Sequence, residues 1–428
     1  MKEDVMLVST SRYLENGSVL KSALILLFLT VFNFLILNAQ TGVYTVNGTS
    51  ETQTGQTYTA TATDQSAVYV LNSGQVVLTN CIIQKTGDSS DINESSQYGL
   101  NAGILTKSGG SVTMQGGSVN TSAAGANGLF ATGSGSIITM SDGNITAVGT
   151  GAHGVDATYT GTIILNNVNV TTNGDNSSVI ATDFGGGTVT VNGGIILSAS
   201  TTSGSHSAAI YSTGIITVNN ATATSMADCG GVIDGANSII LNQTDLIGAL
   251  HGIKVWKTAP ATGSATITIT EGSITAHDGD VFYITGETGN AASATINLNE
   301  GAEVTSDNGY ILNVKSGSSA VLNISNSDVS GNLYADSNSS MTANMNNNAQ
   351  FTGYILNGAV TMDQGSQWTL TANSSLTTIV TPAISGNNVT NITGNGFSIH
   401  YNASLAANSY LNGQIYNLVN GGVLTPDN

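Results

Sequence analysis

A short run of β-branched and aliphatic residues returns along the chain from about residue 75 to residue 363. The second inward residue of successive runs is Met114, Met140, Leu165, Val191, Val218, Leu241, Ile269, Leu298 and Ile324, at steps of 23 to 29 residues. Each run is followed by a turn and by two further short alternating segments, such as 118–119 and 128–131. A period in this range indicates stacked units that bury a continuous core only together. The pattern therefore predicts an all-β chain folded as a single-stranded parallel β-helix, a solenoid of about a dozen coils with a period near 26 residues.

The composition agrees with this fold. Charged residues make up only 8% of the chain, as expected where in-register stacking would place like charges one strand spacing apart. Proline occurs 3 times, because each coil must donate its N–H groups to the next. Asparagines share one slot directly after the first strand, where their amides are expected to form a hydrogen-bonded ladder. They are Asn166, Asn192, Asn219, Asn242 and Asn299.

The N-terminal segment has a different character. Residues 22–37 are apolar, follow Lys21 and are succeeded by the small residue Ala39. A basic residue, a short apolar core and a small residue are typical of a secretory signal peptide, and the run is short for a membrane span. We predict a cleaved signal peptide over 1–39, with an uncleaved membrane anchor as the alternative. Either outcome predicts export of the remainder.

Beyond the signal peptide, we expect the parallel β-helix over 40–363 and C-terminal coils with a cap over 364–428. Cys81 and Cys229 fall in units five coils apart, which corresponds to roughly 24 Å at one strand spacing per coil. A disulfide requires Cα atoms within about 7 Å. The repeat therefore predicts two buried, unpaired thiols, although export alone would favour a bridge.

The charge is one-sided, with a formal net charge of −18. Beyond residue 39 the cationic side chains are Lys85, Lys107, Lys254, Lys257 and Lys315. Nucleic-acid binding needs a basic stripe that displaces counterions from phosphate, so nucleic acid is excluded as a partner. The 5 histidines lie on separate coils without zinc-type spacing, and we expect no metal or cofactor.

The signal peptide, the coils and the terminal segment GSQWTLTANSSLTTI (365–379) resemble the passenger regions of bacterial autotransporter adhesins. The resemblance covers most of residues 40–428. It implies a right-handed β-helix that is secreted or displayed on the outer membrane of a Gram-negative cell. It also implies an adhesin whose partners are glycans or proteins of host or neighbouring cells. The chain departs from that family by lacking the C-terminal translocating barrel, which implies a separate outer-membrane secretion partner.

Parallel β-helices also carry polysaccharide-cleaving enzymes, so carboxylate pairs must be considered. The candidates for a polygalacturonase-like hydrolase are Asp234, Asp278 and Asp280, which we expect on adjacent coils. His153-Gly154 and His251-Gly252 faintly resemble an element of that family. Both histidines precede the third strand, where other coils carry Asn127 and Asn308, and a polar turn residue explains them. A hydrolase is therefore the alternative interpretation.

A threonine row occupies the outward slot of the first strand, at Thr113, Thr139, Thr190, Thr217 and Thr268. Such rows occur in ice-binding proteins, which makes ice binding a remote alternative. Ile164, Ile240, Asn297 and Asn323 interrupt the row, and the β propensity of threonine accounts for it. The sequence favours an exported, non-enzymatic solenoid acting in adhesion or surface structure.

Overall fold

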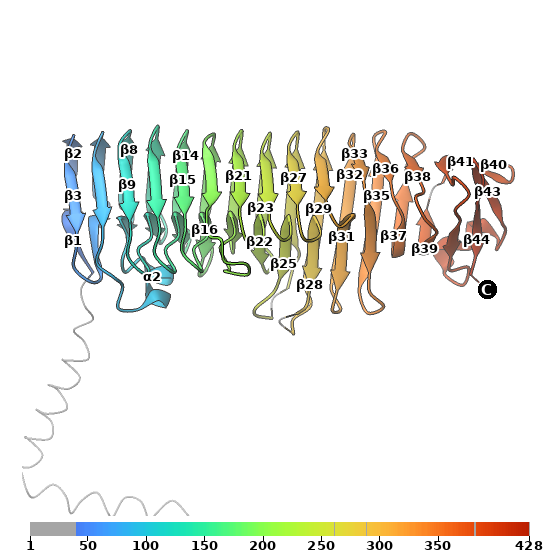
Figure 1. Ribbon diagram of the computed structural model, residues 1–428, viewed down its shortest axis with the longest axis horizontal. Coiled ribbons are helices and arrows are strands. Elements are labelled where there is room, and N and C mark those ends of the chain that lie inside the picture. Colours follow the sequence, from blue (N-terminus) through green and yellow to red (C-terminus); the bar gives the residue numbers. More distant parts are fainter. Residues whose placement is uncertain (1–39, 261, 288, 381, 428) are drawn as a thin grey trace, which may run out of the picture. The chain divides into compact units, whose positions relative to one another are not determined.

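The computed structural model describes residues 40–260, 262–287, 289–380 and 382–427. The predicted signal peptide over 1–39 lies outside the described residues. Residues Gly42–Asn428 form one compact unit, which is a β-solenoid of about 15 turns with a period of about 25 residues. In Figure 1 its coils follow one another along a single axis. Within the described part of the chain, no helix has both the length and the apolar character needed to cross a membrane.

Three columns of short parallel strands run along the solenoid (Figure 1). The first-strand column comprises β2 (Ser50–Thr54), β5 (Gln75–Thr79), β8 (Ser111–Gln115), β11 (Ile137–Ser141), β14 (Thr162–Asn166), β17 (Thr188–Asn192), β20 (Ile215–Asn219), β23 (Ser238–Asn242), β26 (Ala265–Thr270), β29 (Ser293–Asn299), β32 (Ser319–Ser325), β35 (Ser340–Asn346), β37 (Ile355–Met362), β39 (Ser374–Val380), β42 (Ile399–Tyr401) and β44 (Val423–Pro426).

The second-strand column comprises β3 (Thr57–Ala60), β6 (Ile82–Lys85), β9 (Ser118–Thr121), β12 (Asn144–Ala147), β15 (Asn169–Thr172), β18 (Ile195–Ser198), β21 (Thr222–Ser225), β24 (Asp245–Gly248), β27 (Ser273–Ala276) and β30 (Glu303–Ser306). A later row pairs in the order β33 (Asp328–Ser330), β36 (Gln350–Thr352), β38 (Gln367–Thr369), β41 (Asn388–Thr393) and β43 (Tyr416–Val419).

The third-strand column comprises β1 (Thr41–Asn47), β4 (Gln65–Leu71), β7 (Ile104–Lys107), β10 (Leu129–Thr132), β13 (Val155–Thr158), β16 (Ile180–Asp183), β19 (Ile210–Ser212), β22 (Gly231–Asp234), β25 (Ile253–Trp256), β28 (Phe282–Thr285), β31 (Tyr310–Lys315) and β34 (Asn332–Ala335), and it joins the first column at β37. Its outward face carries the candidate site described below.

The register of the first-strand column confirms the predicted repeat. All nine predicted anchor residues, from Met114 to Ile324, lie opposite one another in consecutive coils. Each is at most 1% exposed and belongs to the continuous core. The predicted solenoid is confirmed, with about 15 turns where about a dozen coils were predicted. Segments before residue 75 and after residue 363 form parallel coils, as expected.

The end of the chain departs from the regular coil. Antiparallel pairs join β40 (Ile384–Ser385) to β41, and β43 to β44. The short 3₁₀ helix η1 (Ala406–Leu411) contributes the buried residues Asn408 and Leu411. Trp368 is fully buried against Phe351, and its indole N–H donates to Gly353 O at 2.9 Å.

The asparagine ladder forms over four of its five predicted members. Each amide donates to that of the preceding coil: Asn192 to Asn166 at 2.9 Å, Asn219 to Asn192 at 2.8 Å, and Asn242 to Asn219 at 2.8 Å. Asn299 occupies the same slot, but its neighbours there are Thr270 and Ser325, which carry no amide. A second ladder, which the sequence analysis did not identify, links Asn297, Asn323 and Asn344 with 2.8 Å bonds.

The two cysteines lie where the repeat places them. Cys81 precedes β6 and Cys229 precedes β22, and both are buried and free. Their first strands, β5 and β20, are separated by β8, β11, β14 and β17, which confirms the predicted five-coil step.

One insertion covers part of the third-strand column. The segment 86–103 contains the helix α2 (Ile92–Tyr98), capped by Asp91, whose carboxylate accepts from the N–H groups of Asn93 and Glu94. Beneath the insertion, Leu105 and Phe130 pack with Tyr69 and Ala102 in a small cluster outside the main core. Outward-facing residues of β7, β10 and β13 are buried for this reason, whereas the following coils are more open.

Candidate functional site

A groove begins on the outward face of the third-strand column at the edge of the α2 insertion. A cavity of about 500 Å³ extends from Ile92 on α2 past His153 and Asp183. A second cavity of about 190 Å³ continues over Cys229 and His251. Both cavities are lined by His206, Tyr211 and Trp256, so we treat them as one feature and name it the third-strand groove.

The α2 insertion is fastened to the coil of β13. Thr158 Oγ1 donates to Gln97 O at 3.1 Å, and the ring of Tyr98 stacks on that of Tyr159 with centroids 5.9 Å apart. Gly151 contacts the insertion so closely that a Cβ there would lie 2.5 Å from Ile92 Cγ2. The helix therefore forms a fixed wall of the groove and removes Asp156 from solvent.

Two carboxylates and an imidazole gather at the floor of the groove. Asp156, in the middle of β13, is fully buried, and neither of its carboxylate oxygens has a hydrogen-bond partner among the described residues. Asp183, at the end of β16, and His153, directly before Gly154 and β13, complete the group. One potential ligand atom from each of the three residues lies within 4.8 Å of the other two.

The surroundings of these groups shift their pKa values. Burial, followed by the charge of Asp183, raises the pKa of Asp156 well above its ordinary value. Burial also raises the pKa of Asp183 to about 6. The hydrogen bond from Phe184 N–H lowers this pKa, and the charge of Asp234 raises it further. The pKa of His153 is lowered to about 4 because burial disfavours the imidazolium. All three shifts favour the uncharged side chains, since a small buried site disfavours charge.

The far half of the groove is lined by rings. Trp256 lies 4.5 Å from Lys254 Nζ, measured to the ring centroid, and Lys254 forms an ion pair with Glu287. The ring of His251 stacks on that of Tyr283 with centroids 4.5 Å apart. These rings come from the adjacent strands β25 and β28 and from the turn before β25. All three rings are half-buried. The His206 ring also stacks on Trp256 with centroids 6.5 Å apart, and Lys315 Nζ lies 5.8 Å from the Tyr283 ring centroid.

The predicted carboxylate group does not form. Asp234 ends β22 and accepts hydrogen bonds from the N–H and the hydroxyl of Thr258 at 2.9 and 2.6 Å. Asp280 precedes β28, is buried and accepts from the amides of Asn308 and Asn313 at 3.0 Å each, whereas Asp278 is exposed. Since β25 separates β22 from β28, Asp234 lies two coils from the other two, so the expected adjacency is wrong.

The two predicted turn histidines do occupy the slot before the third strand. His153 N–H donates to Asn127 Oδ1 at 2.8 Å, and His251 Nδ1 accepts from Asp280 N–H at 3.0 Å. Both nevertheless line the groove, so the turn role and a functional role coincide. Asp156 and Asp183 were not predicted as site residues from the sequence. The available signal for Asp156 was its position between the apolar residues Val155 and Ala157 of a third strand.

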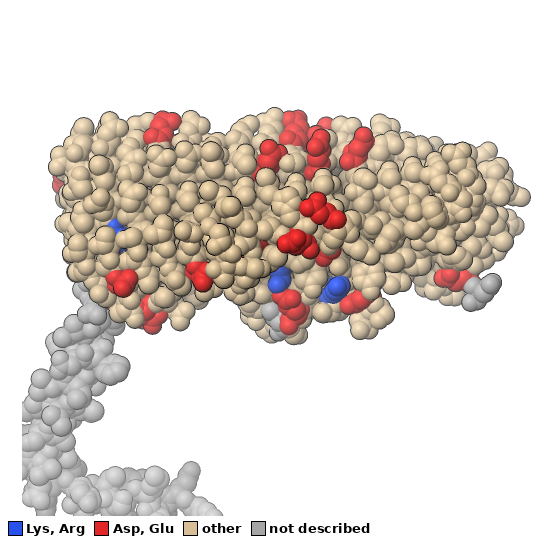
Figure 2. Space-filling view, in the orientation of Figure 1, with Lys and Arg blue, Asp and Glu red and all other residues tan. Residues whose placement is uncertain are grey.

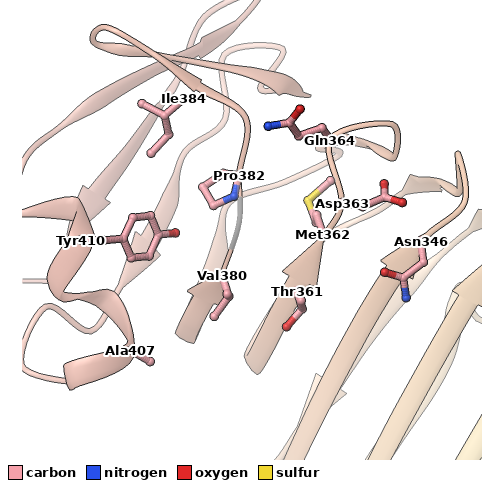
Figure 3. A pocket seen from close by; sticks show the side chains of 10 residues that line it. All are labelled: Asn346, Thr361, Met362, Asp363, Gln364, Val380, Pro382, Ile384, Ala407 and Tyr410. Carbon is pink, nitrogen blue, oxygen red and sulfur yellow. The ribbon is translucent and has the colours of Figure 1, made fainter.

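A larger cavity, of about 730 Å³, lies near the C-terminal end (Figure 3). Tyr410 and Ile384 stand on one side of it, and Met362 and Asp363 on the other. Its polar groups are already engaged: Asp363 accepts from the N–H groups of Asn347 and Ser366, and Tyr410 donates to Ile379 O. The cavity therefore lacks the unpaired buried group that distinguishes the third-strand groove.

Charge is distributed unevenly over the surface. Figure 2 shows several separate groups of acidic side chains on one face and few basic ones. A cavity of about 650 Å³ is lined by Glu271 and Glu300, in turns after first strands, and by Glu303 and Asp328, which begin β30 and β33. Glu271 and Glu300 accept hydrogen bonds from Gln243 and Asn326 of neighbouring coils, so these carboxylates serve coil stacking.

Neither a protein-family model nor any curated protein matches this chain. The function is therefore inferred from the third-strand groove itself.

Proposed function

We propose that the protein is an exported, surface-associated β-solenoid that binds an extended glycan along the third-strand groove and acts in adhesion. The ring side chains of Tyr211, His251 and Trp256, which line the third-strand groove, carry this proposal. Strands of successive coils lie about 4.8 Å apart, and β22 separates Tyr211 on β19 from Trp256 on β25. A ligand that contacts both rings must therefore extend over two coils, which suits a chain of sugars.

The polar side chains of the groove support a carbohydrate ligand. Binding sites for small organic groups combine apolar surface with a few convergent polar groups. Here Lys254, His206 and Asp183 stand among the rings, and they offer both donors and acceptors to hydroxyl groups. Many weak contacts along a repeated surface add up through multivalency, which suits adhesion to glycans of host or neighbouring cells.

The remaining parts of the proposal come from the sequence. The apolar segment 22–37 supports export, and the resemblance to autotransporter passengers supports display on a Gram-negative surface with help from a separate outer-membrane partner.

Binding without cleavage fits the carboxylates better than hydrolysis. Paired catalytic carboxyl groups of glycosidases lie about 5–5.5 Å apart in retaining enzymes and about 6.5–9.5 Å apart in inverting ones. One oxygen of Asp156 lies within 4.8 Å of one oxygen of Asp183, near the retaining value, but Asp156 is fully buried and therefore out of reach of a sugar. Of the other candidates, Asp234 and Asp280 are hydrogen-bonded and lie two coils apart, and Asp278 is exposed.

The test is a panel of soluble polysaccharides assayed for binding to the purified protein and for release of reducing ends or unsaturated products. We expect binding without product, weakened at least about tenfold by Trp256→Ala, the loss of one buried ring contact being worth about 1.4 kcal/mol or more. Phe397→Ala, which removes a 37% exposed ring outside the groove, is the matched control and should bind as the parent does. Equal binding by both variants, or turnover by the parent, contradicts the proposal.

A further inference from the structure

The coil register brings His153, Asp156 and Asp183 together at the floor of the third-strand groove. Asp156 is the second residue of β13 and lies opposite Ala181 of β16. Alanine contributes only a methyl group at this point, which leaves room beside Asp156 for the Asp183 side chain two residues further along. His153 enters from the turn before β13. A potential ligand atom of each lies within 4.8 Å of the other two.

Asp156 differs from the other buried carboxylates of the described chain in having no partner from another coil: neither oxygen is in hydrogen-bond geometry, and only the N–H of the adjacent Ala157 acts on the carboxylate. Asp64 accepts from Ser90 N–H at 2.8 Å, and Asp228 accepts from Ser207 N–H at 3.2 Å. Asp280 accepts from two amides, as described above. Both oxygens of Asp156 are buried and outside hydrogen-bond geometry, and Asp156 is grouped with another acid, Asp183, and with His153. The ionised form of Asp156 is therefore costly at this place in the fold unless a positive charge lies beside it.

His153 is held in the form that binds metals. Its Nδ1 lies 3.3 Å from the carbonyl oxygen of Ser178 in the next coil. Donation of Nδ1–H to that carbonyl leaves Nε2 unprotonated, with its lone pair free. This arrangement, in which a backbone carbonyl orients the ring through one nitrogen, is typical of histidines that ligate a metal through the other.

We propose that His153, Asp156 and Asp183 bind a divalent transition-metal ion, for which Zn²⁺ is the best match. An imidazole nitrogen with two carboxylate oxygens favours Zn²⁺ over Ca²⁺ and Mg²⁺, which prefer oxygen ligands alone. The ion supplies the charge that neutralises Asp156 and Asp183. This site does not depend on the glycan proposal, because it follows from the buried acid and the register alone.

The dimensions and the access suit such an ion. Ligand atoms of a four-coordinate zinc lie roughly 3.4 Å apart at bonds of about 2.1 Å, so the present separations close with small side-chain rotations. His153 and Asp183 line the 500 Å³ cavity, which provides an entry path. Three protein ligands leave one coordination position free, which a water molecule or a donor atom of a groove ligand can occupy.

Three other His–Asp pairs of the described chain lack these features. His251 Nδ1 lies 3.8 Å from Asp280 Oδ2, but both oxygens of Asp280 accept hydrogen bonds from amides. His277 Nδ1 lies 3.1 Å from Asp307 Oδ2, and His400 Nδ1 lies 3.6 Å from Asp427 Oδ1, but all four of these side chains are about half exposed or more and no third ligand joins either pair. These pairs provide controls that have the same residue types without the buried site.

The experiment is calorimetric titration of the full chain, stripped with a chelator, with Zn²⁺ and in parallel with Mg²⁺ and Ca²⁺. We expect one Zn²⁺ per chain, a raised thermal midpoint in its presence, and weak or absent binding of the other two ions. Asp156→Asn and Asp183→Asn should each weaken Zn²⁺ binding at least about tenfold, since each removes a ligand charge. Asp307→Asn should bind as the parent does. Substituting Co²⁺ should give visible absorption bands that Asp183→Asn alters.

Asp183 is only partly buried, so Asp183→Asn keeps the test informative if Asp156→Asn fails to fold. The thermal midpoint of each metal-free variant reports folding separately from binding. The absence of Zn²⁺ binding by the folded parent overturns the proposal. So does unchanged affinity in a folded Asp183→Asn variant, or an equal loss in Asp307→Asn.

Discussion

Replacing Asn192 by alanine removes two side-chain hydrogen bonds that join three successive coils. Asn192 Nδ2 donates to Asn166 Oδ1 at 2.9 Å, and Asn192 Oδ1 accepts from Asn219 Nδ2 at 2.8 Å. Each half-buried bond contributes about 1 kcal/mol, so Asn192→Ala should lower the free energy of unfolding by about 2 kcal/mol. Asn242 ends the ladder and donates one such bond, at 2.8 Å, so Asn242→Ala should cost about half as much.

The suitable assay is native-state hydrogen exchange, because stacked units couple mainly to their neighbours and a long array need not unfold in one step. A loss of about 2 kcal/mol corresponds to a roughly 30-fold decrease in protection, expected in β14, β17 and β20. The distant strands β32 and β35 should keep their protection. Asn192→Asp is a useful second variant. Its carboxylate still accepts from Asn219 Nδ2, but its second oxygen replaces the amide donor and faces Asn166 Oδ1, another acceptor.

Two results would refute the ladder argument. One is an equal cost for the interior and the terminal alanine variants, because the number of bonds lost would then be irrelevant. The other is a decrease in protection spread evenly over all coils, because the effect would then be general rather than carried by the amide contacts.

Leu241→Ala removes a fully buried anchor and should cost about 2–5 kcal/mol in denaturant unfolding, whereas Val77→Ala, at a 42% exposed site, should change stability by less than about 0.5 kcal/mol. Thiol titration of the denatured chain should count two free cysteines, Cys81 and Cys229, and the native Cys229 should resist alkylation at mildly alkaline pH because burial raises its pKa to about 12. Burial lowers the pKa of Lys85 from 10.5 to about 8, so the unfolded chain holds this proton more tightly. Stability relative to Lys85→Met should therefore rise between these pH values, and a flat difference in urea midpoints would contradict this.

The solenoid could be predicted because its determinants repeat. The spacing from Met114 to Ile324 sets the register of the first strand, and one error in it would turn the whole strand outward. The ladder was predictable for the same reason, but only as far as asparagines occupy consecutive coils. Asn299 shows the limit: the slot is right, while its neighbours Thr270 and Ser325 have no amide to pair with.

The candidate site was less predictable because it depends on departures from the repeat. Asp234 was expected on the coil adjacent to Asp278 and Asp280, whereas the register places it two coils away from them and Asp278 is exposed. Asp156 lies in a third strand, but its environment comes from an insertion some sixty residues earlier in the chain, at 86–103.

The repeat in the sequence by itself determined the fold class, the register of the core and the separation of the two thiols, because each follows from a pattern that every coil restates locally. The groove was decided only by the tertiary structure. Helix α2 packs on the outward face of β13, where Asp156 is buried. The next coil places Ala181 opposite Asp156, and Asp183, two residues after Ala181, lies close to Asp156. Burial and proximity of like charges are properties of the folded arrangement, since in the unfolded chain the same carboxylates are hydrated and far apart.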